Sequence, residues 1–140
     1  MQDGTFSPPG HRDETPAARG DLFARDCPTR RLLDRIGDKW SALSLLLLDE
    51  EPRRFNDLKR RIDGISQKML SQTLRALERD GLLTRHVAAT VPVQVSYRLT
   101  PLGQELIAAL RPMMAWAEAR MPEVLAAQRA YERRENAEGA

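Results

Sequence analysis

The residues of this chain with the clearest chemical pattern lie in the stretch Ser66–Gly81. At about 100° per residue, a helix there collects cations, an amide and a hydroxyl on one side, with no carboxylate among them. That polar face consists of Lys68, Ser71, Gln72, Arg75 and Arg79. Arginine and glutamine match the edges of guanine and adenine in a major groove, and lysine and serine suit phosphates. A solvated helix face is the simpler interpretation, so the neighbouring segments must decide between the two.

The same stretch has the features of a helix with defined ends. Its opposite side is an apolar stripe made by Leu70, Leu74 and Leu77. Ser66 can accept hydrogen bonds from the first free N–H groups, and Gly81 can adopt the left-handed conformation that ends a helix. We therefore predict a helix over residues 66–80 that buries one face and exposes the polar one.

A shorter helix is predicted immediately before it. Phe55–Ile62 places Leu58 and Ile62 four residues apart on an inner face, with Asn56 as the expected N-cap. Asp63-Gly64 then makes a tight turn, so about three residues join the two helices. This spacing is typical of a helix-turn-helix unit.

Two strand-like segments follow the second helix. Residues 82–87 and 93–99 alternate and are rich in branched or aromatic side chains, and the short loop 88–92 joins them. Arg53-Arg54-Phe55 could pair beside them as a short edge strand. A helix-turn-helix followed by a two-stranded hairpin predicts a mainly α-helical fold with a small β-hairpin wing, a winged helix-turn-helix.

The distribution of charge agrees with a nucleic-acid partner. Between Arg53 and Arg98 the chain carries ten cations and four anions, a net charge of +6, whereas the whole chain is only +2. The remaining residues therefore sum to −4. Basic charge concentrated in one segment is the electrostatic footprint expected of a protein that binds a polyanion such as double-stranded DNA.

The segment before the helix-turn-helix is predicted to add two helices. Pro28 suits a first turn, and a helix over Thr29–Ile36 would end at Gly37. Asp38 then caps a helix over Lys39–Leu48, whose run of leucines favours burial nearly all round. These helices would complete the core of one ordinary domain, since 140 residues is too short for two.

A long apolar stripe follows the wing. Thr100 is the expected N-cap of a helix that starts at Pro101. Pro112 predicts a kink or a break into two helices. The stripe could fold back on the chain's own core, but its length favours a homodimer interface, which would hold two recognition helices about 34 Å apart on the duplex. Its members recur every three or four residues: Leu102, Leu106, Leu110, Met113, Ala117, Met121 and Val124.

These elements define three segments. Residues 1–24 are rich in Pro and Gly and poor in large apolar residues, which favours a disordered arm. Residues 25–128 would form the winged helix-turn-helix domain, including C-terminal dimerisation helices over about 100–128. Residues 129–140 are charged and are expected to form a flexible tail.

Several short motifs in one colinear order resemble the HxlR-type family of bacterial winged helix-turn-helix transcriptional regulators, over about residues 27–121. The resemblance implies a homodimeric, sequence-specific DNA-binding regulator with an architecture like that of MarR-type proteins, and family habit favours a repressor. The motifs are Cys27-Pro28, Ile36-Gly37-Asp38-Lys39-Trp40, Pro52-Arg53-Arg54-Phe55-Asn56-Asp57-Leu58, Gly64-Ile65-Ser66-Gln67-Lys68-Met69-Leu70, Leu77-Glu78-Arg79-Asp80-Gly81-Leu82 and Tyr97-Arg98-Leu99-Thr100-Pro101-Leu102-Gly103.

The resemblance also implies three groups of DNA contacts. Arg53, Arg54 and Asn56 match the segment before the motif, which would touch backbone phosphates. Arg85 and His86 match the wing; because its tip carries no cation, Arg85 and Arg98 at the wing base are the better candidates. The positions that match the recognition helix are Ser66, Gln67, Lys68, Ser71, Gln72 and Arg75.

Cys27 is the only cysteine, so it cannot form an intrachain disulfide. An inert, partly buried side chain is one interpretation. A helix N-terminus with Arg25, Arg30 and Arg31 nearby would instead favour the reactive thiolate, although Asp26 opposes it. Some members of the family that the chain resembles sense quinones, aldehydes or oxidants through the matching cysteine. Cys27 is therefore a candidate thiol switch.

Other functions have less support. A regulator gated by a non-covalent ligand is an alternative, with Met69, Met113, Met114, Met121 and Trp116 as pocket candidates, although such residues are more often plain core. A winged-helix adaptor that binds protein instead of DNA is a further alternative. The chain shows no catalytic motif, and His11 and His86 lack metal-site spacing, so we expect no enzyme, no metal and no cofactor. Its longest apolar run is Leu45–Leu48, which favours a cytoplasmic protein without a membrane partner.

Overall fold

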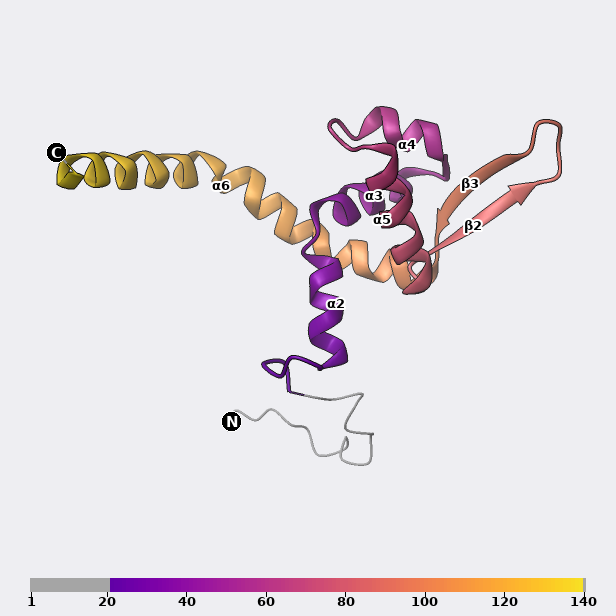
Figure 1. Cartoon of the computed structure of the whole chain (residues 1–140), viewed down its shortest axis with the longest axis horizontal. Helices are drawn as coiled ribbons and strands as arrows, with labels where there is room; N and C mark the ends of the chain where they lie inside the picture. Colours follow the sequence, from indigo (N-terminus) through magenta and orange to yellow (C-terminus); the bar gives the residue numbers. More distant parts are fainter. Residues whose placement is uncertain (1–20, 140) are drawn as a thin grey trace.

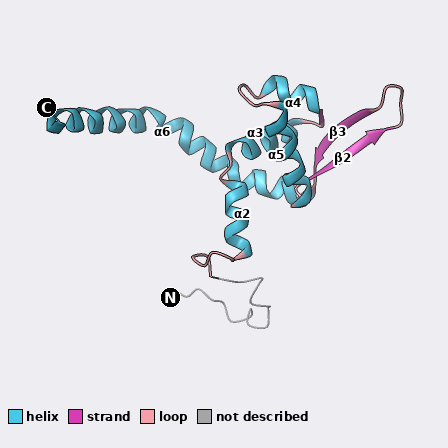
Figure 2. Ribbon diagram, in the orientation of Figure 1, coloured by secondary structure: helices cyan, strands magenta, loops and turns pink. Residues whose placement is uncertain are grey.

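The computed structural model describes residues 21–139, and most of the expected arm at 1–24 lies outside the described residues. The predicted fold class is confirmed: the chain is mainly helical, with one small antiparallel sheet (Figures 1 and 2). In chain order the elements are α2 (Pro28–Ile36), α3 (Lys39–Glu50), β1 (Arg53–Arg54), α4 (Phe55–Arg61), α5 (Gln67–Arg79), β2 (Leu83–Ala88), β3 (Gln94–Leu99) and α6 (Pro101–Gly139).

The recognition-type helix α5 forms as predicted. The Oγ of Ser66 accepts a hydrogen bond from the Met69 backbone N–H at 3.0 Å, and Gly81 follows the helix with a φ of 79°. The predicted N-cap of α4 is wrong, because Arg54 occupies the cap position and Asn56 lies in the first turn. The buried face of α5 consists of Leu70, Thr73, Leu74 and Leu77.

The sheet has the order β1-β3-β2, so the predicted edge strand is confirmed beside the wing. Leu83 pairs with Leu99 at the base of the hairpin, and Ala88 pairs with Gln94 near its tip. Directly paired residues of an antiparallel sheet share a face, and successive residues alternate between faces. The pairing register therefore determines which side chains of β2 and β3 lie on the same face of the wing.

The core lies where α3, α5, the wing base and the start of α6 meet. In α3, Asp38 accepts a hydrogen bond from the Ser41 backbone N–H at 3.0 Å, which confirms the predicted cap. The expectation that α3 is buried nearly all round holds for most of its circumference: Leu45 and Leu48 are in the core, Leu46 and Leu47 pack against it, and Leu43 is the exposed leucine. Within the described chain, α2 buries none of its own residues.

The start of α6 is docked tightly on the core. The Oγ1 of Thr100 accepts a hydrogen bond from the Gly103 backbone N–H at 3.0 Å, as the predicted N-cap should. A Cβ added at Gly103 would lie 2.1 Å from the carbonyl oxygen of Leu82, so only glycine allows this approach. Leu110 is buried and Leu106 packs against the same core. Their assignment to a dimer interface is therefore corrected.

The contacts of α6 with the core continue past Leu110, since Arg111 pairs with Asp49 and Met114 packs against the core, and the C-terminal part of the helix then projects from the body of the protein (Figure 1). α6 remains one helix through Pro112 and Pro122, and Figure 1 shows changes of direction along it, so the predicted kink or break takes the form of a kink. The segment expected to be a flexible tail at 129–140 is helical as far as Gly139, since Ala, Glu, Gln and Arg favour helix. Among residues 21–139, no helix has the length and apolarity that crossing a membrane requires.

Candidate nucleic-acid interface

The outward face of α5 carries the predicted polar residues together. One open hollow of about 490 Å³ is lined by Gln67, Lys68, Ser71, Gln72 and Arg75. Arg79 is exposed one turn further along the helix and does not line the hollow. Ser66 sits at the helix start, where its oxygen is engaged as the cap. The exposed first two turns of α5 therefore present amides, hydroxyls and cations to one partner surface.

Arg53 does not belong to this surface, and its assignment as a phosphate contact is corrected. Its side chain is only 6% exposed. The guanidinium donates to the Leu47 carbonyl at 3.1 Å, to Asp57 Oδ2 at 2.8 Å and to Glu50 Oε1 at 2.5 Å. Because these partners use the guanidinium inside the chain, Arg53 joins the end of α3 to the first turn of α4.

The Arg53 contact also sets the charge state of its neighbour. The hydrogen bond from Arg53 lowers the pKa of the Asp57 carboxyl below its ordinary value, and the charges of Arg53 and Arg60 act in the same direction. Asp57 also accepts a hydrogen bond from Arg60 at 3.1 Å. The carboxylate at the start of α4 is thus ionised and paired.

Arg54 and Asn56 remain available beside the wing. Both are exposed, and both line a hollow of about 730 Å³ with Arg60 and the wing residues Val93 and Val95. The hollow lies between the start of α4 and β3. Two of the three residues predicted before the motif are therefore in a position to touch a nucleic-acid backbone.

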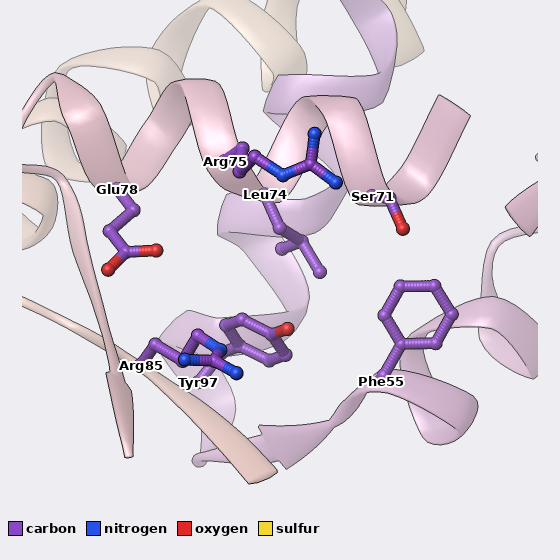
Figure 3. Close-up of a pocket in the computed structure, with 7 residues that line it drawn as sticks. All are labelled: Phe55, Ser71, Leu74, Arg75, Glu78, Arg85 and Tyr97. Carbon is purple, nitrogen blue, oxygen red and sulfur yellow. The ribbon is translucent and has the colours of Figure 1, made fainter. Parts of the chain in front are cut away.

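The two wing-base arginines lie on opposite faces of the hairpin. Arg85 pairs with Tyr97, and Arg98 pairs with Thr84. These two pairs are adjacent along the hairpin, so their side chains point to opposite faces. The Arg85 face looks toward α5 (Figure 3). The Arg98 face carries Thr84 and His86, whose side chains are hydrogen-bonded at 2.9 Å. Arg85 and Arg98 thus cannot serve one common surface.

Figure 3 shows a groove between α5 and the wing base that was not predicted from the sequence. Phe55 and Tyr97 line it together with Arg75 and Arg85. The groove could have been anticipated only in part: once β2 and β3 are paired in register, Arg85 must lie opposite Tyr97. The tip of the wing, in contrast, is apolar, and Val91 is 100% exposed.

Cys27 is placed at the N-cap of α2, as predicted, and is 3% exposed. The nearby arginines bind backbone oxygens: Arg30 donates to the Phe23 carbonyl at 2.9 Å, and Arg31 donates to the Asp26 carbonyl at 3.1 Å. The side chain of Cys27 itself makes no capping hydrogen bond within the described helix. Cys27 therefore lies at a helix N-terminus, and its side chain is almost completely buried.

The remaining predicted residues lie along α6. Met113 is 55% exposed, Met121 and Ala117 are also exposed, and Val124 is half-buried. Of the five residues named as candidates for an effector pocket, Met114 lines a small hollow of about 310 Å³ beside α3. Leu102 is exposed near Gly81, apart from the free half of the helix. Among residues 21–139, no cluster of His, Cys, Asp and Glu could hold a metal ion.

Comparisons with known proteins agree with this geometry. A model of the HxlR-like helix-turn-helix family matches residues 35–124. An HTH-type transcriptional regulator of Escherichia coli K12, YtfH, is 46% identical over 107 residues, covering 76% of this chain and 85% of the relative. The structure described as transcriptional regulator ytfH from Salmonella typhimurium has a TM-score of 0.74 at 42% identity, over 79% of this chain and 98% of that one. The redox regulator HypR in its reduced form has a TM-score of 0.66 at 34% identity, over 71% and 98% of the two chains.

Proposed function

This chain belongs to the HxlR-like helix-turn-helix family of DNA-binding transcriptional regulators, which are not enzymes, and from that premise we propose that it is a homodimeric, sequence-specific repressor of the cytoplasm. The observation that carries the proposal is the hollow on α5, where Gln67, Lys68, Ser71, Gln72 and Arg75 lie together. Amide groups on an exposed helix can read base edges in a major groove, and the cations beside them suit either base edges or phosphates.

Further contacts would hold the duplex around α5. Arg54 and Asn56 at the start of α4 would bind backbone phosphate on one side. Arg85 and Arg79 would extend the basic surface toward the wing, whereas Arg98 would meet DNA only if the duplex reached the opposite face of the hairpin. The DNA-binding domain would span residues 25–128, with its dimerisation helix starting at about residue 100.

The homodimer is supported by apolar side chains that the chain itself leaves uncovered. Met113, Met121 and Trp116 on the free part of α6 are exposed, and so are Leu32 and Leu33 on α2. Isolated exposed apolar residues are common, but a sustained stripe on projecting helices marks a contact surface. A second copy of this chain would cover the stripe and set the spacing of two α5 helices on one duplex.

Fluorescence anisotropy tests DNA binding directly. The purified protein is titrated onto the intergenic DNA upstream of its own gene and onto a random duplex of equal length, at two salt concentrations. The proposal predicts tighter binding to the intergenic DNA and a steep loss of affinity with salt. The double variant Lys68→Ala/Gln72→Ala should lose the preference, while the control Arg133→Ala, an exposed cation at the far end of α6, should keep it.

A salt-independent affinity would contradict the DNA-binding proposal and would favour the adaptor alternative, in which the winged domain binds protein. A salt-dependent affinity without preference for the intergenic DNA would contradict specificity for that sequence. Whether the protein represses or activates is then measured with a reporter fused to the same intergenic DNA, in cells with and without the gene. Repression predicts higher reporter output when the gene is deleted.

A thiol switch at Cys27 is a second proposal, which the likeness to the redox regulator HypR, solved in reduced and oxidised forms, supports. Cys27 begins α2, one of the two helices proposed to meet the partner subunit. Diamide would take two electrons and two protons from two Cys27 thiols, one from each subunit, and the disulfide formed between them would displace α2 at that contact and release DNA. Diamide should therefore abolish DNA binding by the unchanged protein, a reductant should restore it, and Cys27→Ser should be insensitive to diamide.

DNA release by diamide that persists in Cys27→Ser would contradict the switch. DNA binding that is indifferent to diamide in the unchanged protein would favour a non-covalent ligand as the effector.

A further inference from the structure

The groove between α5 and the wing base has a composition unlike the rest of the surface (Figure 3). It has a volume of about 340 Å³ and brings together side chains from four elements. Its lining residues are Phe55, Ser71, Leu74, Arg75, Glu78, Arg85 and Tyr97. Two guanidinium groups and two hydroxyl groups thus meet over apolar walls in a site large enough for one small anionic group.

The two arginines approach the groove from different elements. Arg75 comes from α5, and Arg85 comes from β2 on the wing (Figure 3). Arg85 is held at its backbone by pairing with Tyr97, and Tyr97 is a buried member of the core. Arg75 therefore stands on the recognition helix, and Arg85 stands on a strand that is paired to a residue of the core.

Arg75 lies at the border of two surfaces. It lines the open hollow on the outer face of α5 and also this groove. Figure 3 shows its guanidinium directed along α5 toward Ser71, above the side chains of the wing. A group bound in the groove would therefore be adjacent to whatever occupies the outer face of α5, which is the proposed position of the DNA major groove.

The other lining groups favour a single phosphate. The hydroxyls of Ser71 and Tyr97 can each donate a hydrogen bond to a phosphate oxygen, and guanidinium groups bind phosphate in bidentate geometry. Among the described residues that line the groove, Glu78 supplies the one carboxylate. Its charge opposes any bound anion, so that two guanidinium groups and one carboxylate leave a net charge of about +1, which one phosphodiester balances.

We propose that this groove is a phosphate clamp, in which Arg75 and Arg85 share one backbone phosphate of the bound duplex. The clamp rests on the proposed function, because it requires that α5 lie on DNA. It assigns Arg75 to a position-fixing contact, leaving base reading to the other residues of the α5 hollow. It also fixes the wing to the recognition helix only when DNA is present.

A double-mutant cycle tests whether one phosphate is shared. Affinities for the upstream intergenic DNA and for a random duplex are measured over a range of salt for Arg75→Ala, Arg85→Ala and the double variant. Each single change should weaken binding about tenfold on both duplexes, as loss of a charge-assisted hydrogen bond predicts. Once one arginine is gone, removing the other should cost less than it does alone, and the salt slope of the double variant should fall by about one phosphate, not two.

The control cycle pairs Arg75→Ala with Arg98→Ala, because Arg98 lies on the opposite face of the wing. The fold loss of DNA affinity in this double variant should equal the product of the losses in the two single variants. Circular dichroism and thermal unfolding of every variant establish that the exposed substitutions leave the fold intact. Methylphosphonate substitution along the intergenic DNA gives a second measurement: neutralising a single phosphate should remove the effects of both Arg75→Ala and Arg85→Ala.

The results separate the two proposals. Independent losses for Arg75 and Arg85, or a salt slope that falls once for each of them, would overturn the clamp while leaving DNA binding in place. A loss for Arg75→Ala confined to the intergenic DNA would also overturn it, since that result means base reading. Failure of the unchanged protein to bind either duplex in a salt-dependent way would overturn the proposed function and the clamp with it.

Discussion

Arg53 and Asp57 form an ion pair, with 2.8 Å between Nη1 and Oδ2, that joins β1 to the first turn of α4. The same guanidinium also reaches Glu50 at the end of α3. The arginine that the sequence suggested as a phosphate contact is therefore an internal link, and its neighbour Arg54 is the exposed one. Adjacent residues of one strand point to opposite faces, which explains why two neighbouring arginines have different roles.

Arg53→Ala should lower the stability of the fold, whereas Arg54→Ala should lower only DNA affinity. Removing the Arg53 guanidinium takes a donor away from the Leu47 carbonyl and from Glu50, and leaves Asp57 with Arg60 alone. Urea unfolding of Arg53→Ala should show a lower midpoint at neutral pH. Arg54→Ala should unfold like the unchanged protein and weaken binding to the intergenic and random duplexes alike, with a salt slope smaller by about one.

The reverse pattern would contradict these roles. If Arg53→Ala unfolded normally and lost affinity for DNA, the guanidinium would have to leave its internal partners on binding. Arg53→Lys is the informative intermediate, since it keeps the charge and lacks the geometry to donate to three separate acceptors. It should fall between Arg53→Ala and the unchanged protein in the midpoint of unfolding.

Acid should weaken the fold through Asp57. Its pKa in the folded protein is lowered from an ordinary value of 3.8, chiefly by the hydrogen bond from Arg53. A lowered folded pKa contributes stability that is present above the unfolded pKa and is lost as pH falls through the folded one. Comparing urea midpoints at pH 6 and at about pH 3, Asp57→Asn should lose less stability than the unchanged protein over this interval.

The control for this comparison is Glu138→Gln, which removes an exposed carboxylate near the end of α6. Its loss of stability between the two pH values should equal that of the unchanged protein. If Asp57→Asn also behaved like the unchanged protein, the Arg53 contact would not be coupled to folding in the way the ion pair implies.

Gly103→Ala should destabilise the protein by about 1 to 3 kcal/mol, the usual cost of overpacking a well-packed contact. The added Cβ would meet the backbone of Leu82 at 2.1 Å, and backbone cannot move aside as a flexible side chain can. Gly139→Ala is the matched control, because nothing lies within 4 Å of its added Cβ. Chemical unfolding measures both; equal stability for the two variants would show that α6 can shift at little cost.

Local signals were enough to predict most elements of the fold. Ser66, Gly81, Asp38 and Thr100 act through hydrogen bonds or backbone angles within a few residues, so their roles are readable from the sequence. Leu110 shows where this reasoning stops: a stripe at helical spacing does not say which of its members reach the chain's own core. The path of α6 after Pro112 depends on packing that periodicity does not encode.

The residues of the candidate site likewise fall into those that local sequence spacing predicts and those that it does not. The polar face of α5 was predicted because helical spacing alone brings its residues together. Arg53 was misassigned although its carboxylate partners Glu50 and Asp57 lie only three and four residues away, because residue type and spacing do not say which of two adjacent arginines points inward. Arg85 and Arg98 look equivalent in the sequence, and only the pairing register of the hairpin separates their faces. In both cases the face on which a side chain lies, and not its residue type, decided its role.

Gln72→Ala should relax sequence preference more than it weakens binding overall. Gln72 is exposed in the α5 hollow, and a glutamine amide can pair with the adenine edge in the major groove. Loss of one such pair is worth about 1 to 3 kcal/mol of discrimination at a single position. Affinities for the intergenic DNA and its single-base variants measure this; a uniform loss over all duplexes would identify Gln72 as a backbone contact.

Met113→Glu/Met121→Glu should convert the proposed dimer into monomers. Both methionines are exposed and neither belongs to the core, so the double variant should fold normally. Charges buried between two copies without partners would oppose association. Size-exclusion chromatography with light scattering measures the mass, and anisotropy at low protein concentration should show weaker DNA binding, because two linked recognition helices bind more tightly than one.

The control Val91→Glu, at the exposed wing tip, should keep the mass of the unchanged protein. A double variant that remained dimeric would mean that the two copies associate through another surface, for which the exposed face of α2 with Leu32 and Leu33 is an apolar candidate.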